Sequence, residues 1–374
     1  MANARAQRTV VALVGLLFSA GFVALALRHL HLRAVAEAWH DAHALPWIPL
    51  AVLAYVVGHF LRGQRLRILV QRESALSLPT ATNVVVVGYA SNNVFPARLG
   101  ELVRAGMLAE RTGIPVAQAL TVTFIERLLD GIAILVLLLA GVAMLPVRPD
   151  WIWDVARVAA LVFGGALAVM LVAVFLPSVV LSMASRLSRR LGPKGRDRVL
   201  VLATSITSAG AVLRNPRGSL TIGLYSVVVW LFEATMFACI LPVFSLKLSL
   251  APALVAMSVT NLGILVPSSP GFVGPFHFFC SQALASQGVP DATAMGYALV
   301  VHLAFYVPVT LWGAGAMLWY GVQVGSTAAM ARAAKQSPTV ERVGGVPMHL
   351  IARLEAAPPG AVASAFDVAL TRAM

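Results

Sequence analysis

Charged residues are scarce in this sequence. Lysine, arginine, aspartate and glutamate together make up 11% of its 374 residues, against about 25% in a typical soluble domain. Hydrophobic residues make up 59% of the chain, and the mean hydropathy is +0.85. This balance excludes a soluble globular domain and predicts a protein that crosses a membrane several times.

Cysteine and the common catalytic motifs are also absent or nearly so. Cys239 and Cys280 are the only cysteines and lie in apolar segments, so no disulfide framework and no cysteine metal site is expected. The GxSxG, HExxH and Walker motifs are missing, and no segment could fold as a nucleotide-binding domain. We therefore expect no catalytic residue, no metal and no cofactor. We also expect that the chain is not an enzyme and does not drive transport with ATP by itself.

Acidic residues are few. There are 15 of them against 28 lysines and arginines, which gives a net charge of +13. The basic residues gather in loops between apolar runs, as they do on the cytoplasmic side of membrane proteins. There they can contact anionic lipid head groups. The expected partner is thus a membrane lipid and not a nucleic acid, and the oligomeric state, including a homo-oligomer, is left open.

Long apolar runs are abundant. About 20 apolar residues cross the roughly 30 Å of hydrocarbon in a bilayer. Hydropathy and loop charge predict full spans at residues 10–27, 46–61, 116–147, 153–184, 218–246 and 292–320. The basic segments 62–72 and 185–217 then mark cytoplasmic loops, and the middle of the second is expected to lie along the membrane surface. Both termini are predicted to be cytoplasmic, with the chain in the inner (cytoplasmic) membrane.

Two segments are too polar and too interrupted to be ordinary spans. They are "PTATNVVVVGYASNNVFP" (79–96) and "TNLGILVPSSPGFVGPFHFF" (260–279). If the first crossed the membrane, Arg98, Arg104 and Arg111 would lie outside. Each segment is therefore predicted to be a re-entrant helical hairpin whose polar break lines an internal cavity, because broken backbone at membrane depth must avoid lipid.

The predicted fold class is an all-α polytopic membrane protein with about six full transmembrane helices and two re-entrant helical hairpins. The halves start from opposite sides, so they form an inverted-topology repeat, with residues 1–150 as the first repeat and 151–325 as the second. Residues 326–374 are predicted to be a cytoplasmic tail. Transporters use such repeats, and their binding sites lie where broken helices meet.

The first candidate group lies just after the first break. Arg98, Glu101 and Arg104 are spaced three residues apart and share one face of a helix. The second group is "ERLLD" near the start of a long span. It holds Glu126, Arg127 and Asp130, of which Arg127 and Asp130 can pair at i,i+3. This pairing leaves Glu126 free to reach Arg98 or Arg104.

Two interpretations of these groups stand side by side. Each charge placed in lipid costs about 2.5–3.5 kcal/mol unless it is paired or faces a cavity. In the functional interpretation, Arg98, Arg104 and Arg127 hold a phosphate, because guanidinium groups match phosphate oxygens. Glu101 and Glu126 would then limit the positive charge. In the structural interpretation, the same residues form a salt-bridge network that ties the hairpin to the long helix.

The second half of the chain adds isolated polar residues. Glu233 lies within a span and could serve proton coupling or pair with a basic group near Arg62. His277 follows the glycine turn and could face the cavity, whereas His302 is more typical of a satisfied core histidine.

Three asparagines lie at or near the predicted breaks. Asn92, Asn93 and Asn261 could touch a ligand or cap broken helix ends. Capping is the favoured role, because asparagine is a strongly preferred N-cap residue.

The sequence resembles a known family at the first break. "NNVFPARLGELVRAGML" followed by "GIPVAQALTVTFIERLLDG" is similar to the lysylphosphatidylglycerol synthase transmembrane-region family of flippase-like proteins, over about residues 10–325. "PSSPGFVG" resembles the family's second proline-glycine turn, after which this sequence has His277 where a glutamate is expected. The residues of this segment, "PSSPGFVGPFHFF", are similar to those of a hopanoid-associated branch of the family. The positions of this sequence that match the family's motif residues are Asn93, Pro96, Arg98, Gly100, Glu101, Arg104, Glu126, Arg127 and Asp130.

In the best-known members this region is fused to an aminoacyl-transferase domain, and the membrane part moves the lipid between leaflets. Only residues 326–374 follow the last predicted span, so the resemblance implies the translocating half. The expected function is a lipid translocase for an anionic phospholipid, polyprenyl-phosphate or hopanoid-type lipid. The alternatives are a membrane-embedded enzyme with Glu101, Glu126 or Asp130 as acid or base, and an accessory subunit of a lipid-synthesis complex.

Overall fold

The structure, a computed structural model, describes residues 45–95, 98–189, 191–266, 269–320, 342–343 and 346–347. These residues are helical or in connections, apart from the short strands β1 (Arg342–Val343) and β2 (Val346–Pro347), which pair antiparallel. The all-α class predicted from the sequence is confirmed at this level. The predicted first span, 10–27, and most of the predicted tail, 326–374, lie outside the described residues.

The described helices follow one another with short connections. They are α3 (Trp47–Val70), α4 (Leu78–Val94), α5 (Gly100–Thr112), α6 (Val116–Met144), α7 (Asp150–Phe175), α8 (Pro177–Ser188), α9 (Pro193–Ala209), α10 (Pro216–Ile240), α11 (Leu250–Gly263), α12 (Pro275–Ala285) and α13 (Asp291–Tyr320). The 3-10 turns are η2 (Gly210–Arg214), η3 (Pro242–Phe244) and η4 (Pro270–Phe272). Proline begins α8, α9, α10 and α12, where its missing N–H is not needed and its fixed φ suits a helix.

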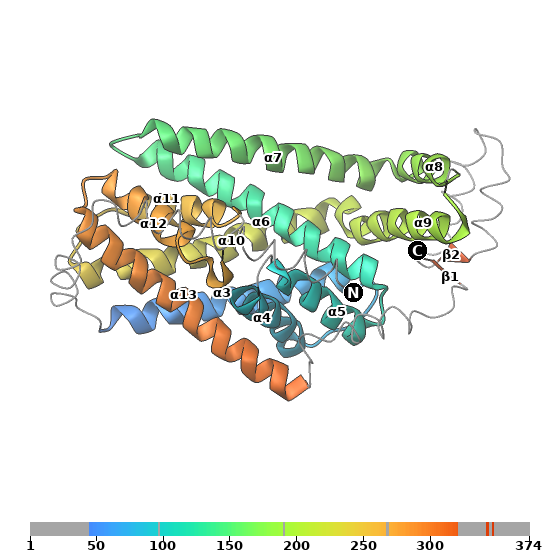
Figure 1. Cartoon of the computed structure of the whole chain (residues 1–374), viewed down its shortest axis with the longest axis horizontal. Helices are drawn as coiled ribbons and strands as arrows, with labels where there is room; N and C mark the ends of the chain where they lie inside the picture. Colours follow the sequence, from blue (N-terminus) through green and yellow to red (C-terminus); the bar gives the residue numbers. More distant parts are fainter. Residues whose placement is uncertain are drawn as a thin grey trace, which may run out of the picture.

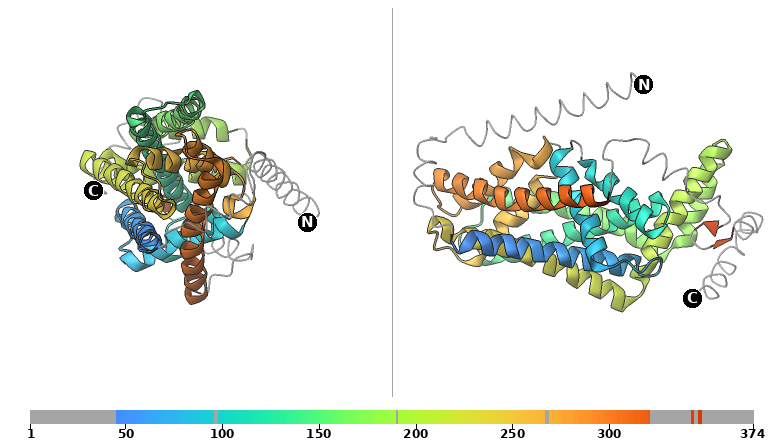
Figure 2. Two further views of the ribbon diagram at one scale, coloured as in Figure 1. Left: turned by 90° about the vertical axis from the view of Figure 1, so that its left-hand side faces the viewer. Right: turned by 90° about the horizontal axis from the view of Figure 1, so that it is seen from below.

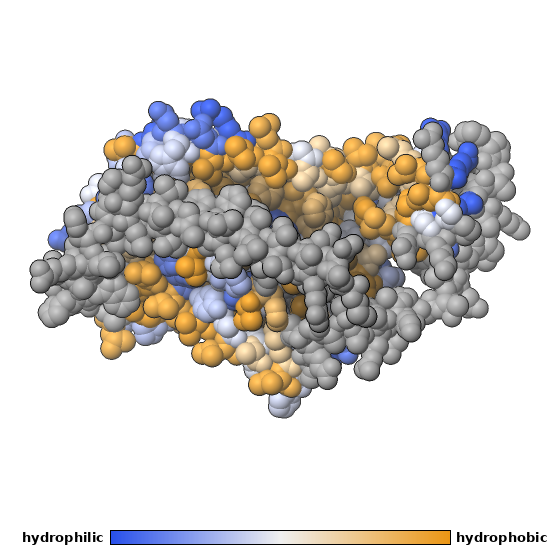
Figure 3. Space-filling model, viewed as in Figure 1, coloured by the Kyte–Doolittle hydropathy of each residue, from blue (hydrophilic) through white to orange (hydrophobic). Residues whose placement is uncertain are grey.

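Four of the described helices are long and apolar enough to cross a membrane: α6, α7, α10 with η3, and α13. They run largely along the long axis of the molecule (Figure 1). Hydrophobic residues dominate the visible flank, and hydrophilic ones gather near the α6–α7 connection and at the end beside α8 and α9 (Figure 3). The molecule is thus a helical protein built to contact lipid, in agreement with its composition.

Both predicted hairpins consist of two packed helices. α4 lies against α5, and α11 lies against α12. The first hairpin breaks after Phe95, which is extended, and resumes at Arg98, whose φ is +54°. The second break contains η4. Pro96 lies outside the described residues, and the depth to which either hairpin enters a membrane stays a prediction.

The packing of the two halves follows one scheme. α3 lies against α10 at the centre, α4 lies against α13, and α11 lies against α6. α5 packs on α6 as α12 packs on α13. When α3 to α6 are matched with α10 to α13, these contacts of one half have counterparts in the other. The view from below shows α3 and α13 next to each other, and the end-on view shows that α13 is inclined to the long axis (Figure 2). This arrangement supports the inverted repeat, which stays a prediction.

The prediction for α3 is wrong at its C-terminal end. The helix does not stop at residue 61 but continues to Val70, so Arg62 and Arg65 lie inside it and not in a cytoplasmic loop. Their side chains are 1% and 0% exposed. Loop charge is a guide to topology only when the charges lack partners, and acids of α6 and α10 pair with these two arginines.

The predicted cytoplasmic segment 185–217 contains helices, and its position on the cytoplasmic side stays a prediction. α7 ends at Phe175, because Pro177 cannot continue it. Most of the described residues that follow are helical, in α8, α9 and η2. α9 packs against α6 and α8, so it is part of the bundle. Its position relative to the membrane surface stays a prediction.

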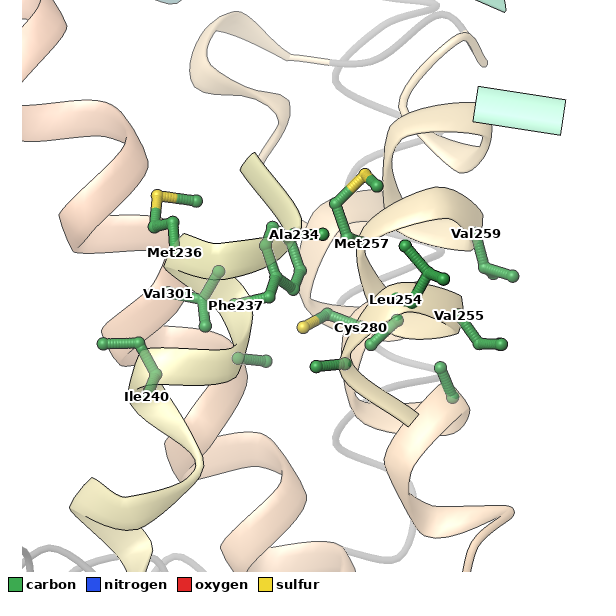
Figure 4. Packing of buried hydrophobic residues seen from close by; sticks show 14 of the residues in the cluster. Ala234, Met236, Phe237, Ile240, Leu254, Val255, Met257, Val259, Cys280 and Val301 are labelled. Carbon is green, nitrogen blue, oxygen red and sulfur yellow. The ribbon is translucent and has the colours of Figure 1, made fainter. Parts of the chain in front are cut away.

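The main apolar core lies where α10, α11, α12 and α13 meet. Phe237 of α10, Met257 of α11, Cys280 of α12 and Val301 of α13 are fully buried there. Figure 4 shows these side chains packed between the ribbons. α7, in contrast, exposes much of its apolar surface. The second hairpin is therefore anchored in the core, whereas α7 offers a lipid-facing surface.

Candidate functional site

Charged side chains from four helices meet in the interior beside this core. We call this set the ionic cluster: Arg62 and Arg65 of α3, Glu101 and Arg104 of α5, Glu126, Arg127 and Asp130 of α6, and Glu233 of α10. The cluster joins segments more than 100 residues apart. It is formed by the first hairpin, the long helix that follows it, and the central α3–α10 pair.

The α3 arginines form the base of the ionic cluster. Arg62 Nη2 donates to Glu233 Oε2 at 2.7 Å. Arg65 Nη1 donates to Asp130 Oδ1 at 2.6 Å and to the Ser226 hydroxyl at 2.8 Å. The Arg62–Glu233 pair is the ion pair considered from the sequence. Arg65 was missed as a site residue, although its i,i+3 spacing from Arg62 on an apolar helix was a usable signal.

Glu126 and Arg127 join the hairpin to α6. Glu126 accepts a hydrogen bond from Arg104 and also lies 3.5 Å from Arg65 Nη2. It therefore reaches Arg104 and not Arg98. Arg127 lies 3.6 Å from both Glu101 and Asp130 and donates to the hydroxyl of Tyr89 at 3.0 Å. The i,i+3 contact between Arg127 and Asp130 is the one that the spacing predicts.

Burial divides the ionic cluster into a floor and a rim. Arg65, Arg104 and Glu126 are at most 1% exposed. Arg127 and Glu101 are 28% and 23% exposed. In this conformation an incoming molecule could touch the rim but not the floor. Arg104, which the sequence suggested as a phosphate ligand, lies in the floor.

The floor has more hydrogen-bond donors than acceptors. Nε and Nη1 of both Arg62 and Arg104, and Nε of Arg65, are buried with no hydrogen-bond partner among the described residues. Each buried unpaired donor costs about 1–3 kcal/mol, and more when it is charged. Two carboxylate oxygens of the floor, Oδ2 of Asp130 and Oε1 of Glu233, are also buried without a hydrogen-bond partner among the described residues. The floor therefore has more unpaired donors than unpaired acceptors, although its three arginines are balanced by three carboxylates.

Arg98 links the two broken segments. Its Nη2 donates to the carbonyl of Ile264 at 2.9 Å, and its guanidinium lies 5.6 Å from the ring centre of Phe272. Arg98 and Phe272 both have positive φ, +54° and +59°, which is uncommon for residues other than glycine and recurs at functional sites. The breaks of the two hairpins therefore meet, as binding sites between paired broken helices require.

The three candidate asparagines make different contacts. Asn92 Oδ1 accepts from the Gly100 N–H at 2.8 Å, so Asn92 ties the start of α5 to the end of α4. Its Nδ2 also lies 3.3 Å from Glu101 Oε1. Asn93 donates to Thr310 of α13, and Asn261 donates to the carbonyl of Met257 in its own helix. The structure thus brings Asn92 to the rim, places Asn93 in a contact between α4 and α13, and brings the side chain of Asn261 to Glu233 of the ionic cluster.

His277 lies apart from these charges. Its Nε2 is 3.0 Å from Nδ1 of His302 on α13. The contact between the two histidines could not be predicted from the sequence, because they lie 25 residues apart on different helices.

The fold and this site define a class: a multi-pass helical membrane protein with two broken hairpins that meet beside a buried ionic cluster. The model that describes the lysylphosphatidylglycerol synthase TM region family matches residues 12–313. The chain therefore belongs to this family, and the resemblance noted at the first break is confirmed.

The chain is also similar to a curated protein, glycosyltransferase AglD of Haloferax volcanii. The two are 27% identical over 357 residues, which covers 86% of this chain and 56% of that protein. The chain thus spans just over half the length of this relative. No solved structure matches the chain.

This relative corrects one prediction. The motifs missing from the sequence predict a chain that is not an enzyme, but the relative is named as a glycosyltransferase, which points to an enzyme. The absence of familiar hydrolase and nucleotide-loop motifs was a poor guide, because those motifs cover only some kinds of catalysis. The family and the relative together indicate a function that concerns membrane lipids.

Proposed function

We propose that this protein binds the phosphate-containing head group of a membrane lipid at the rim of the ionic cluster and moves that lipid between leaflets. The observation that carries the proposal is the position of Arg98 and Arg127. Both residues are partly exposed; Arg98 lies in the break of the first hairpin and Arg127 lies on α6, which packs against that hairpin, beside a buried floor that is rich in unpaired donors.

The chemistry of the rim suits a phosphate. Guanidinium groups give two parallel N–H donors to phosphate oxygens, and such charge-assisted bonds are strong. Glu101, also at the rim, is close to Arg127 and lowers the local positive charge, so a bound anion could leave again. The acyl or polyprenyl tails would remain in the bilayer beside the apolar helices.

The relative suggests which lipid to test. Because it is named a glycosyltransferase and the family is named for a lipid synthase, a lipid that carries or receives a sugar is a reasonable ligand. A polyprenyl phosphate and an anionic phospholipid both present the phosphate that this rim would bind.

Arg127→Ala is expected to slow lipid movement by about 10- to 100-fold. A hydrogen bond to a charged group contributes about 1.5–3 kcal/mol, and each 1.4 kcal/mol is a factor of ten. The assay is loss of accessible label in vesicles that contain the purified protein and a trace of fluorescent phosphatidylglycerol or polyprenyl phosphate. Arg127→Lys keeps the charge without the paired donors, so its rate of lipid movement should lie between those of the native protein and Arg127→Ala.

The matched control is Arg157→Ala. Arg157 belongs to an exposed ion pair with Asp154 on α7, so its loss should leave the rate unchanged. The proposal fails if the native protein moves neither lipid, or if Arg157→Ala slows movement as much as Arg127→Ala.

A second function, sugar transfer to or from a lipid within the membrane, is favoured by the name of the relative. Glu101 would be the acid or base, because it lies at the rim and its Oε2 is buried without a hydrogen-bond partner among the described residues. Mass spectrometry of lipids from a deletion strain separates the two functions. A missing lipid species would favour the enzyme, whereas an unchanged set of lipids with altered leaflet distribution would favour the translocase.

A further inference from the structure

The second break is held by a chain of hydrogen bonds through two histidines. His302 Nε2 lies 2.9 Å from the carbonyl oxygen of Gly271, and His302 Nδ1 lies 3.0 Å from His277 Nε2. His277 Nδ1 lies 3.5 Å from the backbone nitrogen of Gly274. This series of hydrogen bonds thus begins and ends on the same turn, and it joins that turn to α12 and α13.

The backbone groups at the two ends of this hydrogen-bond series determine which ring nitrogens carry protons. A carbonyl oxygen can only accept, so His302 Nε2 must carry a proton, and in the neutral ring His302 Nδ1 must then accept. His277 Nε2 must therefore donate, which leaves His277 Nδ1 to accept from the Gly274 N–H. Both histidines are thus neutral and protonated on Nε2, and this assignment satisfies every contact.

A further proton would break this arrangement at one place. His277 Nδ1 has the longest contact in the chain, so it is the most available lone pair. A proton bound there would face the Gly274 N–H, and two donors cannot share a hydrogen bond. The Gly274 end of the turn would be released, whereas the contacts from His277 to His302 and from His302 to Gly271 would remain.

Few ionisable groups face the histidine pair. Tyr306 lies edge-on to His302, with ring centres 5.7 Å apart, and Tyr55 of α3 lies beyond Phe305. α11 carries no ionisable side chain, and the remaining one on α12 is Cys280. Phenylalanine rings, including Phe276 stacked at 4.6 Å on His302, cover much of the pair. The one carboxylate of α13, Asp291, lies in the first turn of that helix, about 16 Å along the helix from His302, and α11 and α12 carry none.

The other helices packed on α13 hold most of their charges in the ionic cluster; the exceptions are Arg67, which donates to the Leu76 carbonyl, and Arg217 in the first turn of α10. On α3, Arg62 and Arg65 are paired with acids, and on α10, Glu233 is paired with Arg62. Tyr89 of α4 is bonded to Arg127. A third histidine, His59 of α3, has its Nδ1 3.0 Å from the Tyr55 carbonyl oxygen of its own helix. The counter-charge for a protonated pair must therefore come from elsewhere.

The 270–274 turn connects the histidine pair to the proposed lipid site. Gly271 accepts from His302, and the next residue, Phe272, lies under the guanidinium of Arg98. We propose that the His277–His302 pair is a proton-binding site that couples proton uptake to the binding of the anionic head group at Arg98. This inference rests on the proposed function and names its energy source: a proton gradient.

Coupling follows from charge and from the shared turn. His302 is buried and His277 is half-buried. A protonated pair there without a carboxylate partner is costly, and an anion at Arg98 would lower that cost. Binding of either species should therefore favour binding of the other, because coupling between two sites is reciprocal.

The proton positions can be measured directly. We expect nitrogen NMR of histidine-labelled protein in lipid nanodiscs to show His277 and His302 as neutral rings protonated on Nε2 near neutral pH. On acidification, His277 should gain a proton on Nδ1, and added phosphatidylglycerol should move that transition to higher pH than phosphatidylcholine does. A ring protonated on Nδ1 at neutral pH, or a transition that does not respond to the anionic lipid, would overturn the inference.

The transport assay separates this inference from the proposed function. In vesicles with an imposed pH difference, the native protein should move the fluorescent lipid at a rate that changes by up to about tenfold per pH unit, the limit for one linked proton. His277→Gln keeps an amide donor toward His302 but cannot bind the proton, so it should move lipid at a rate independent of the pH difference. His59→Gln should keep the pH response.

Each outcome has one meaning. If the native protein moves lipid at a rate that does not depend on the pH difference, proton coupling is refuted and the proposed function is retained. An absence of movement with every lipid would refute the proposed function, and the NMR titration would then decide the proton site alone.

Discussion

Glu126→Gln is expected to destabilise the folded protein by about 3–5 kcal/mol, the usual result of breaking a buried ion pair on one side only. Glu126 is fully buried and serves Arg104 and Arg65 together. Without its charge, Arg104 keeps no carboxylate partner, and its Nε and Nη1 are already unpaired among the described residues. The first hairpin would lose its charged connection to α6.

The measurement is unfolding of purified protein in mixed detergent micelles, followed by tryptophan fluorescence. Asp154→Asn is the matched control, because the Asp154–Arg157 pair is 68% and 73% exposed. Exposed pairs contribute about 0–1 kcal/mol. A Glu126→Gln protein as stable as the Asp154→Asn protein would show that the ionic cluster does not hold the bundle together.

A double variant sharpens this test. In Arg104→Gln/Glu126→Gln both members of the pair are neutral, so no uncompensated charge is left between α5 and α6. The double variant should be more stable than Glu126→Gln alone, because neutral replacements of both partners avoid the desolvation of an isolated charge. Additive losses would mean that the two side chains do not interact.

Gly100→Ala is expected to open the first hairpin. A Cβ at Gly100 would lie 2.1 Å from the backbone carbonyl oxygen of Gly88 and 2.5 Å from Oδ1 of Asn92. The backbone of α4 cannot move without disturbing its contacts with α3 and α13. The expected loss is at least about 1–3 kcal/mol, the usual cost of overpacking. It should be accompanied by loss of the Asn92 contact that starts α5.

The same helix supplies the control. Gly106 has nothing within 4 Å of its would-be Cβ, so Gly106→Ala should stabilise α5 by about 0.5–1 kcal/mol through helix propensity alone. Melting temperatures of the two variants should therefore lie on opposite sides of the native value. If both shifts have the same sign, the close approach of α4 and α5 is not what Gly100 provides.

Much of the architecture could be predicted because its signals are local. The apolar runs predicted α6, α7, α10 and α13, and the polar breaks predicted the two helical hairpins. A helix repeats every 3.6 residues, so the spacing of Arg127 and Asp130 was enough to predict their contact. The family could be recognised for the same reason, from contiguous residues around the first break.

The errors came from treating charge as a property of the loop alone. Arg62 and Arg65 looked like the start of a cytoplasmic loop, but acids on α6 and α10 keep them inside α3. The partner of Arg62 lies 171 residues away in the sequence, and the partner of Arg65 lies 65 residues away. Hydropathy averages over neighbours in the chain and carries no information about such distant partners.

The sequence by itself determined the membrane class, the approximate helices, the two breaks and the residue types of the candidate site. Only the tertiary structure decided which arginine pairs with which acid and which charges form the buried floor and the rim. It alone also showed that the rings of His277 and His302 are in hydrogen-bonding contact. The physical reason is that hydrophobic periodicity acts within one helix, whereas ion pairs and shared protons depend on how helices from opposite ends of the chain pack together.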